Sequence, residues 1–434
     1  MQSNRRSPSR LALLLLLAVA VGACGSASIS AAPTAGPSAA PSVAPSSSGS
    51  IPSALGSSGQ ADQAVYAAIE SQVEAIRELH AQKTVTPVLL DSQGVRDWLT
   101  KANAEQTNHQ ALADESRGFI HLGLLPAGSS LEQMELDLDA GQVVGFYDPV
   151  SKGLYVLSES GGVGPTEKLT FSHEYTHALQ DQNFGLDKLA TDTADQGDRD
   201  LARTALPEGD ATLSMTMWSE KYMSILDLLQ VAGDSLSGPQ ADQLAKAPAI
   251  LRETLTFPYE QGLAFVQGVY ESGGWSAVDK LYASPPDSTS QILHPELYAD
   301  GVEPVSVTVP PVPTALGSGW KLTMQDTLGE FQLGIWLEGE SPSSAEQSSA
   351  AAAVSAWAGD RVGLYEGPND SWAVVLRTTW RTSSGRVAFQ SAATRKTGQL
   401  PGPAVVCADE FGATLDVASD VAALEAFATC RPPL

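Results

Sequence analysis

The sequence has little positive charge, little cysteine and little continuous apolar length. Lys and Arg total 25 against 50 Asp and Glu, which gives a formal net charge of −25. This charge excludes the basic surfaces that bind nucleic acid, and it excludes charge-driven binding to anionic lipid headgroups. The main apolar run, residues 11–21, is shorter than the roughly 20 residues that a membrane-spanning helix needs.

Residues 1–23 have the features of an export signal. Arginines precede the short apolar run, which ends in Val21-Gly22-Ala23-Cys24. These four residues resemble the bacterial lipobox, and the resemblance implies that Cys24 is lipidated and anchors the chain to the outer face of the cell membrane. A plain signal cleavage site without a lipid is the alternative. Residues 24–60, rich in Ser, Ala, Pro and Gly, cannot bury a core and predict a flexible tether.

Only three cysteines are present. With Cys24 assigned to the anchor, Cys407 and Cys430 remain. In an exported chain such a pair is expected to form a disulfide, which here would close the C-terminal segment. No C-x-x-C pair occurs, so the sequence does not support a cysteine-ligated zinc site.

Histidine is also scarce, yet two of the six histidines stand in one His-Glu-x-x-His motif, His173 to His177. On a helix these two side chains share one face, where both imidazoles can bind one Zn²⁺. Glu174, beside the first histidine, is then placed to act as the catalytic general base. A chance match or a pair of buried structural histidines is the alternative, and the Glu between the two makes the metal the stronger interpretation.

A catalytic zinc usually has a third protein ligand, for which Glu208 is the candidate. It lies 31 residues after His177, enough for the chain to return with a second helix, and it opens the segment Glu208-Gly209-Asp210-Ala211. This segment resembles the third-ligand helix of Glu-zincins. The alternative is a solvated Glu stabilised by the dipole of a helix N-terminus. Asp210 is a candidate acceptor for the second N–H of a ligand imidazole.

Residues 143–158 predict a β-hairpin just before the metal-motif helix, which is expected from about residue 166. An exposed edge of that hairpin would bind an extended substrate backbone. An ordinary hairpin covering the core is an equal alternative. Tyr259 and His294 are candidate hydrogen-bond donors to a developing oxyanion, although either residue could equally serve the scaffold.

Together these motifs resemble a known family. The stretch from His173 to Phe184, HEYTHALQDQNF, is similar to the core of a family of bacterial exported or lipoprotein zinc metallopeptidases. Gly145-Phe146-Tyr147-Asp148, Glu208-Gly209-Asp210-Ala211 and residues 285–296 are similar to it as well, and the resemblance is strongest over residues 60–300. It implies a gluzincin-like peptidase core and gives no cleavage specificity.

The predicted fold class is α+β. A mainly helical metallopeptidase domain over 61–300 would contain the small hairpin, and a smaller α+β lobe over 301–434 has no His and no ligand cluster. Within these regions the patterns predict a helix beginning at Phe257, a helix over residues 320–337 and a turn over residues 357–361.

The predicted function is zinc-dependent hydrolysis of peptide bonds at the cell envelope. One Zn²⁺ would be held by His173, His177 and Glu208, the substrate would be a protein or peptide, and no nucleic-acid partner is expected. Two alternatives remain at this stage. One is a catalytically inactive envelope lipoprotein that binds a protein partner, and the other is a zinc amidase that acts on cell-wall peptides.

Overall fold

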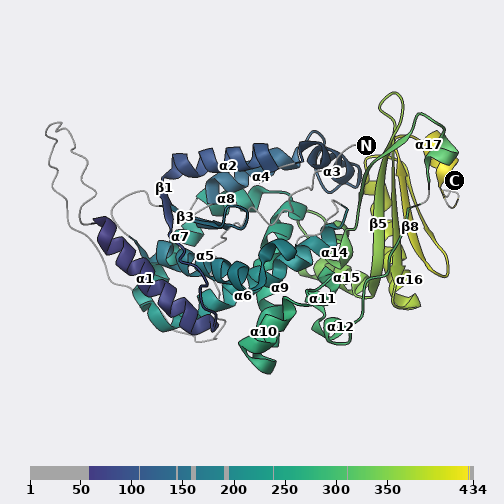
Figure 1. The fold of residues 1–434 in the computed structure, drawn as a ribbon. Coiled ribbons are helices and arrows are strands. Elements are labelled where there is room, and N and C mark those ends of the chain that lie inside the picture. Colours follow the sequence, from purple (N-terminus) through teal and green to yellow (C-terminus); the bar gives the residue numbers. More distant parts are fainter. Residues whose placement is uncertain are drawn as a thin grey trace, which may run out of the picture.

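The computed structural model describes residues 58–106, 108–142, 145–157, 163–189, 195–237, 239–309, 311–428 and 430. The predicted signal and Cys24 lie outside these residues, as does the predicted tether except for its last three residues, which begin the first helix. The fold is α+β, as predicted. Figure 1 shows helices in the middle of the molecule, the larger sheet at one end and helix α1 at the other. Within the described ranges no helix is long and apolar enough to cross a membrane.

The elements have the following bounds. The helices are α1 Ser58–Arg77, α2 Ser92–Gln106, α3 His109–His121, α4 Leu131–Gln142, α5 Pro165–Phe184, α6 Gly197–Tyr222, α7 Ile225–Ser237, α8 Pro239–Lys246, α9 Ala249–Gly273, α10 Trp275–Leu281, α11 Thr289–Leu293, α12 Pro295–Ala299, α13 Pro313–Leu316, α14 Gly329–Glu338, α15 Ser344–Val354, α16 Ser383–Lys396 and α17 Val421–Phe427. The strands are β1 Val88–Leu90, β2 Gly145–Asp148, β3 Gly153–Leu157, β4 Lys321–Asp326, β5 Trp357–Glu366, β6 Trp372–Trp380, β7 Ala404–Ala408 and β8 Gly412–Ala418.

Helix α5 carries the His-Glu-x-x-His motif and is covered by other elements. Pro165 stands in its first turn, where proline costs no helical hydrogen bond, and Gly185 follows its last residue with a positive φ of 78°. Residues 170–181 of α5 are all buried. The helix therefore forms the middle of the helical domain, with α1, α6 and the small sheet packed around it.

Helices α6 and α9 cross at two glycines. A Cβ atom on Gly209 would lie 2.2 Å from the backbone of Gly262, and one on Gly262 would lie 2.3 Å from the Ala205 carbonyl oxygen. Both contacts are with backbone, so no side-chain rotation could relieve them. The two backbones can approach this closely only because neither residue has a side chain.

Both helices contain an internal proline, Pro207 in α6 and Pro258 in α9. The prediction that a helix begins at Phe257 was therefore wrong, since α9 starts at Ala249 and continues through Pro258. Burial of Phe257, Pro258 and Tyr259 in the packed face of α9 outweighs the local cost of that proline.

The predicted hairpin is confirmed. Strands β2 and β3 pair antiparallel, with Phe146 opposite Tyr155, and β1 adds in parallel to the far side of β3. The order β1-β3-β2 makes β2 an edge strand, and all four of its residues are buried.

The C-terminal lobe is an antiparallel five-stranded sheet of order β4-β5-β6-β8-β7, with α14, α15 and α16 packed on its apolar residues. The prediction of one helix over residues 320–337 was wrong in its first half, because β4 pairs there with the buried strand β5 before α14 begins. The segment 357–361 is part of β5 rather than a turn. Cys407 and Cys430 form the predicted disulfide, with their Cα atoms 5.8 Å apart.

The hydrophobic core continues across residue 300. Phe119 of α3 and Leu122, directly after α3, pack into the same buried cluster as the large sheet, and Trp336 Nε1 donates to the Leu122 carbonyl at 2.9 Å. The guanidinium of Arg117 also pairs with Glu366 at 2.6 Å. Elements far apart in the sequence thus hold the lobe against the helical domain.

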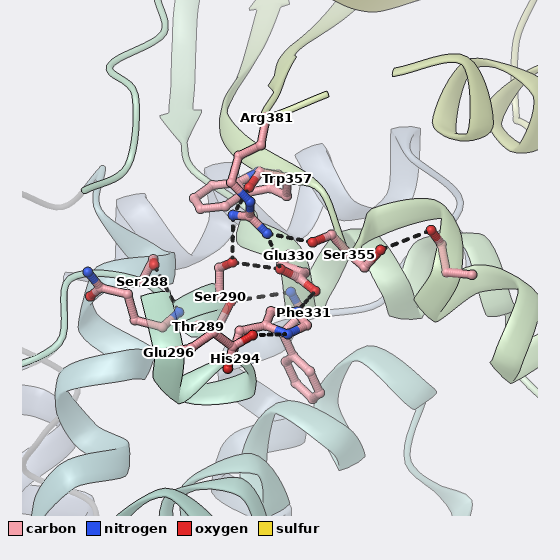
Figure 2. A network of polar contacts seen from close by, with 12 residues as sticks. Ser288, Thr289, Ser290, His294, Glu296, Glu330, Phe331, Ser355, Trp357 and Arg381 are labelled. Carbon is pink, nitrogen blue, oxygen red and sulfur yellow. Dashed lines mark hydrogen bonds and ion pairs between the residues drawn. The ribbon is translucent and has the colours of Figure 1, made fainter. Parts of the chain in front are cut away.

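A polar network completes this attachment (Figure 2). The carboxylate of Glu330, in the first turn of α14, accepts from Ser290 Oγ and contacts His294 Nε2, each at 2.7 Å. Arg381 donates to Ser290 Oγ at 3.1 Å and to the carbonyl oxygen of Trp357. The network joins the segment before α12 to the lobe.

Candidate metal centre

The structure brings together the three predicted ligands. His173 and His177 lie one turn apart on α5, and Glu208 faces them from α6. Their closest atoms form a small triangle: the two Nε2 atoms are 3.0 Å apart, and Glu208 Oε2 lies 3.2 Å from one and 3.4 Å from the other. All three side chains are buried, with at most 1% exposed.

The size of the triangle fits a tetrahedral zinc ion. Ligands bound at about 2.1 Å to a tetrahedral ion lie roughly 3.4 Å from one another. Hydrogen bonds alone do not explain the triangle, because each Nε2 carries at most one hydrogen and can donate to one acceptor. Glu208 Oε1 and His173 Nδ1 are also buried without a hydrogen-bond partner. Two imidazoles and one carboxylate are the ligand set of many catalytic zinc sites.

The charges at the site prepare it for a cation. Burial lowers the pKa of His173 below its ordinary range. Burial would also lower the pKa of His177, but the charge on Glu208 outweighs it and raises that pKa to about 9. Burial would raise the pKa of Glu208, but the charge on His177 and the hydrogen bonds to both histidines outweigh it and lower that pKa to about 2. The carboxylate is therefore ionised at neutral pH, and a bound cation would replace the proton on His177.

Gln180 holds the second imidazole in place. Its Oε1 lies 2.8 Å from His177 Nδ1, and its Nε2 donates to the carbonyl oxygen of Pro207 at 3.0 Å. The amide therefore links one ligand on α5 to the residue directly before the ligand on α6. The only sequence signal for this role is spacing, since Gln180 lies three residues after His177 and both therefore share one helix face.

Glu174, the predicted base, lies against the edge strand β2. The backbone N–H of Tyr147 donates to Glu174 Oε2 at 2.8 Å, and Oε1 has no partner. Gly145 allows this approach, since a Cβ there would lie 2.8 Å from Thr170 Cγ2. Burial raises the pKa of Glu174 to about 8, the charge on His177 lowers it and the charge on Glu208 raises it. The raised pKa makes the deprotonated carboxylate a stronger base than an exposed Glu, which suits a group that accepts and returns a proton.

Asp210 does not contact the imidazoles. Two residues after Glu208, it points to another side of α6, where its carboxylate accepts from Arg77 at 2.6 Å and from Tyr282 Oη at 2.7 Å. Arg77 is fully buried, reaches Asp279 at 2.7 Å and lies 4.4 Å from the ring centroid of Trp275. This network ties α1 and α10 to the helix that carries Glu208.

The two oxyanion candidates lie in different places. The ring of Tyr259, on α9, is centred 6.2 Å from the ring of His173. His294 instead contacts Glu330 in the network that attaches the lobe (Figure 2). Only Tyr259 is thus a neighbour of the metal ligands.

Comparison with known proteins adds little to this geometry. A family profile described as "Domain of unknown function (DUF8575)" matches residues 321–426, which contain the five-stranded sheet of the lobe. A search of curated proteins found no match. Among solved structures, the chain is similar to a crystal structure described as a proposed hydrolase with a novel fold from Chloroflexus aurantiacus. The TM-score is 0.35 at 15% identity, over 57% of this chain and 92% of the other, and a likeness this low supports no inference about activity.

Proposed function

We propose that the protein is a zinc-dependent metallopeptidase. The observation that carries the proposal is the triangle of His173 Nε2, His177 Nε2 and Glu208 Oε2, with sides of 3.0–3.4 Å, beside a fourth buried side chain, Glu174. A zinc ion bound there would supply a Lewis acid and lower the pKa of its water toward neutrality.

Glu174 is suited to move the proton. Its Oε2 is fixed by the Tyr147 N–H, whereas Oε1 is left without a partner and can accept a proton from water. After bond cleavage the same oxygen would give the proton to the leaving amine. Glu174 has no place in the metal triangle itself, so a purely structural zinc site would gain nothing from a buried carboxylate at this position.

The edge strand β2 lies beside the proposed reaction centre. Because the Tyr147 N–H points at Glu174, this side of β2 faces that centre rather than its partner β3. All four residues of β2 are buried, so an extended substrate could pair with this edge only after the edge is uncovered, and backbone hydrogen bonds would then hold it independently of its sequence. Tyr259, whose ring is centred 6.2 Å from that of His173, is a candidate to approach the same centre. Proteins or peptides at the outer face of the cell membrane are the proposed substrates, and amides of cell-wall peptides would meet the same residues.

One observation favours a different function. The ligands and Glu174 are each at most 1% exposed. A closed site of this kind also suits a structural zinc in a lipoprotein that binds a protein partner without catalysis. A peptidase requires that a substrate reach Glu174, whereas a structural zinc site does not.

Zinc content and turnover test the proposal together. The soluble chain from residue 58 onward should hold about one zinc, and Glu208→Ala should lose it or bind it far more weakly. Glu174→Gln should keep the zinc and lose peptide hydrolysis by a factor of about 10² to 10⁴. Wild-type protein that binds no zinc would refute the metal site. Zinc bound without hydrolysis across a panel of peptides and wall fragments would support the structural alternative.

A further inference from the structure

The start of helix α7 presents apolar side chains to solvent. Ile225 and Leu226 are each 77% exposed and Leu229 is 64% exposed. At positions i, i+1 and i+4 they share one side of the helix, and Tyr222, the last residue of α6, is exposed beside them. We call Tyr222, Ile225, Leu226 and Leu229 the α7 stripe. A helix of a globular domain normally buries such a stripe, so an uncovered one marks an interaction surface.

The α7 stripe continues into an apolar groove. The groove, about 380 Å³ in volume, lies between α1, the end of α6 and the start of α7. Val65 and Ala68 line it from the middle of α1, and Trp218 and Tyr222 line it from α6. The apolar surface thus extends from α7 to the middle of α1.

The chain that would carry a lipid leads directly into α1, which forms one wall of this groove. Helix α1 begins at Ser58, 34 residues after Cys24. A chain of that length spans about 120 Å at most. If Cys24 is lipidated, the first turns of α1 are the part of the described structure that is tied most closely to the bilayer.

The net charge of the protein argues against a second copy of this chain as the partner that covers the α7 stripe. Each chain carries a net charge of −25, so two chains repel each other. Near the α7 stripe, Asp227 accepts from Ser224 and Asp234 accepts from Thr166, while Lys221 lies 5.2 Å from the ring centroid of Tyr222. Lys168 also lines the groove. Two lysines beside a tyrosine and leucines suit the headgroup boundary of a membrane, where aromatic rings meet the headgroups and leucines reach the acyl chains.

We propose that the α7 stripe is a membrane-contact surface that rests in the interfacial layer of a phospholipid bilayer. The contact is apolar and involves no basic patch, so it depends on burial of Ile225, Leu226 and Leu229 rather than on lipid charge. It holds the body of the protein against the bilayer, in addition to any lipid on Cys24. The proposal does not rest on zinc binding or peptidase activity.

The test uses chains that cannot be lipidated. Residues 25–434, without Cys24, are sedimented with neutral phosphatidylcholine vesicles as wild type, Leu226→Asp and Phe411→Asp. Phe411 is the matched control because it is 72% exposed on the C-terminal lobe. Leu226→Asp is expected to lower the partition coefficient about tenfold or more, and Phe411→Asp less than twofold. Adding phosphatidylglycerol to the vesicles should not strengthen binding, because the chain is acidic.

Three results would overturn the proposal. Wild-type protein that does not bind neutral vesicles would do so, as would equal losses in Leu226→Asp and Phe411→Asp. Light scattering that shows a wild-type dimer and a Leu226→Asp monomer would assign the α7 stripe to self-association instead. Unchanged circular dichroism and melting temperatures in both variants would exclude misfolding as the cause of a loss.

Discussion

The crossing of α6 and α9 gives the sharpest prediction about how the fold holds the metal centre. In Gly209→Ala, the new Cβ would lie 2.2 Å from the backbone of Gly262, whereas ordinary contacts begin at 3.4 Å. The helices must separate by about 1 Å, because the backbone cannot rotate away, and overpacking against backbone lies at the upper end of the usual cost, about 3 kcal/mol. Alanine has a higher helix propensity than glycine, which stabilises the variant by about 1 kcal/mol. We therefore expect the free energy of unfolding to fall by about 2 kcal/mol in total.

The same change should weaken the metal site. Gly209 directly follows Glu208, and α6 packs against both α9 and α5, the helix that carries the two histidines. A shift of about 1 Å moves Glu208 Oε2 out of a triangle whose sides are 3.0–3.4 Å. We expect zinc affinity to fall at least tenfold, a loss like that caused by mutating groups that orient metal ligands.

A matched control is available in the same helix pair. Gly268, also in α9, has no atom within 4 Å of the position of an added Cβ. Gly268→Ala should therefore stabilise the protein by up to about 1 kcal/mol and leave zinc binding unchanged. Denaturant unfolding and a competitive zinc-chelator titration on both variants measure these effects. If Gly209→Ala unfolds at the wild-type midpoint and binds zinc as tightly, the reasoning from the helix crossing is refuted.

Two further predictions concern buried charge. Arg77→Met should lower the free energy of unfolding by about 3–5 kcal/mol in a denaturant titration, because it leaves the Asp210 carboxylate buried without its cation. The control is Arg96→Met on the exposed side of α2, which should change the free energy of unfolding by less than about 0.5 kcal/mol. His294→Asn should lower the melting temperature more at pH 6 than at pH 9. The hydrogen bond to Glu330 raises the pKa of His294, so its contribution is complete below the ordinary histidine pKa and is lost as pH rises through the raised value. His80→Asn is the control, because His80 also pairs with a carboxylate, Glu74, but is 84% exposed, so its pair should contribute little at either pH. An equal deficit at both pH values in His294→Asn would contradict the assigned pair.

The sequence by itself determined the local parts of the candidate site. The spacing of His173 and His177 requires one helix face, and the glycine and proline pattern around residues 145–153 requires a hairpin, because both depend only on neighbouring residues. The choice of Glu208 came from a resemblance, and the structure places that residue beside both histidines. The disulfide between Cys407 and Cys430 followed from the count of cysteines.

Only the tertiary structure decided the contacts between distant segments. Asp210 faces Arg77 rather than an imidazole because of how α1 and α10 pack around α6, and His294 serves the lobe because α14 brings Glu330 to it. Phe257 lies inside a helix because packing outweighs the preference of a proline. Sequence patterns report which face of an element is apolar. They do not report which other element covers that face, because that depends on the free energy of packing the whole chain.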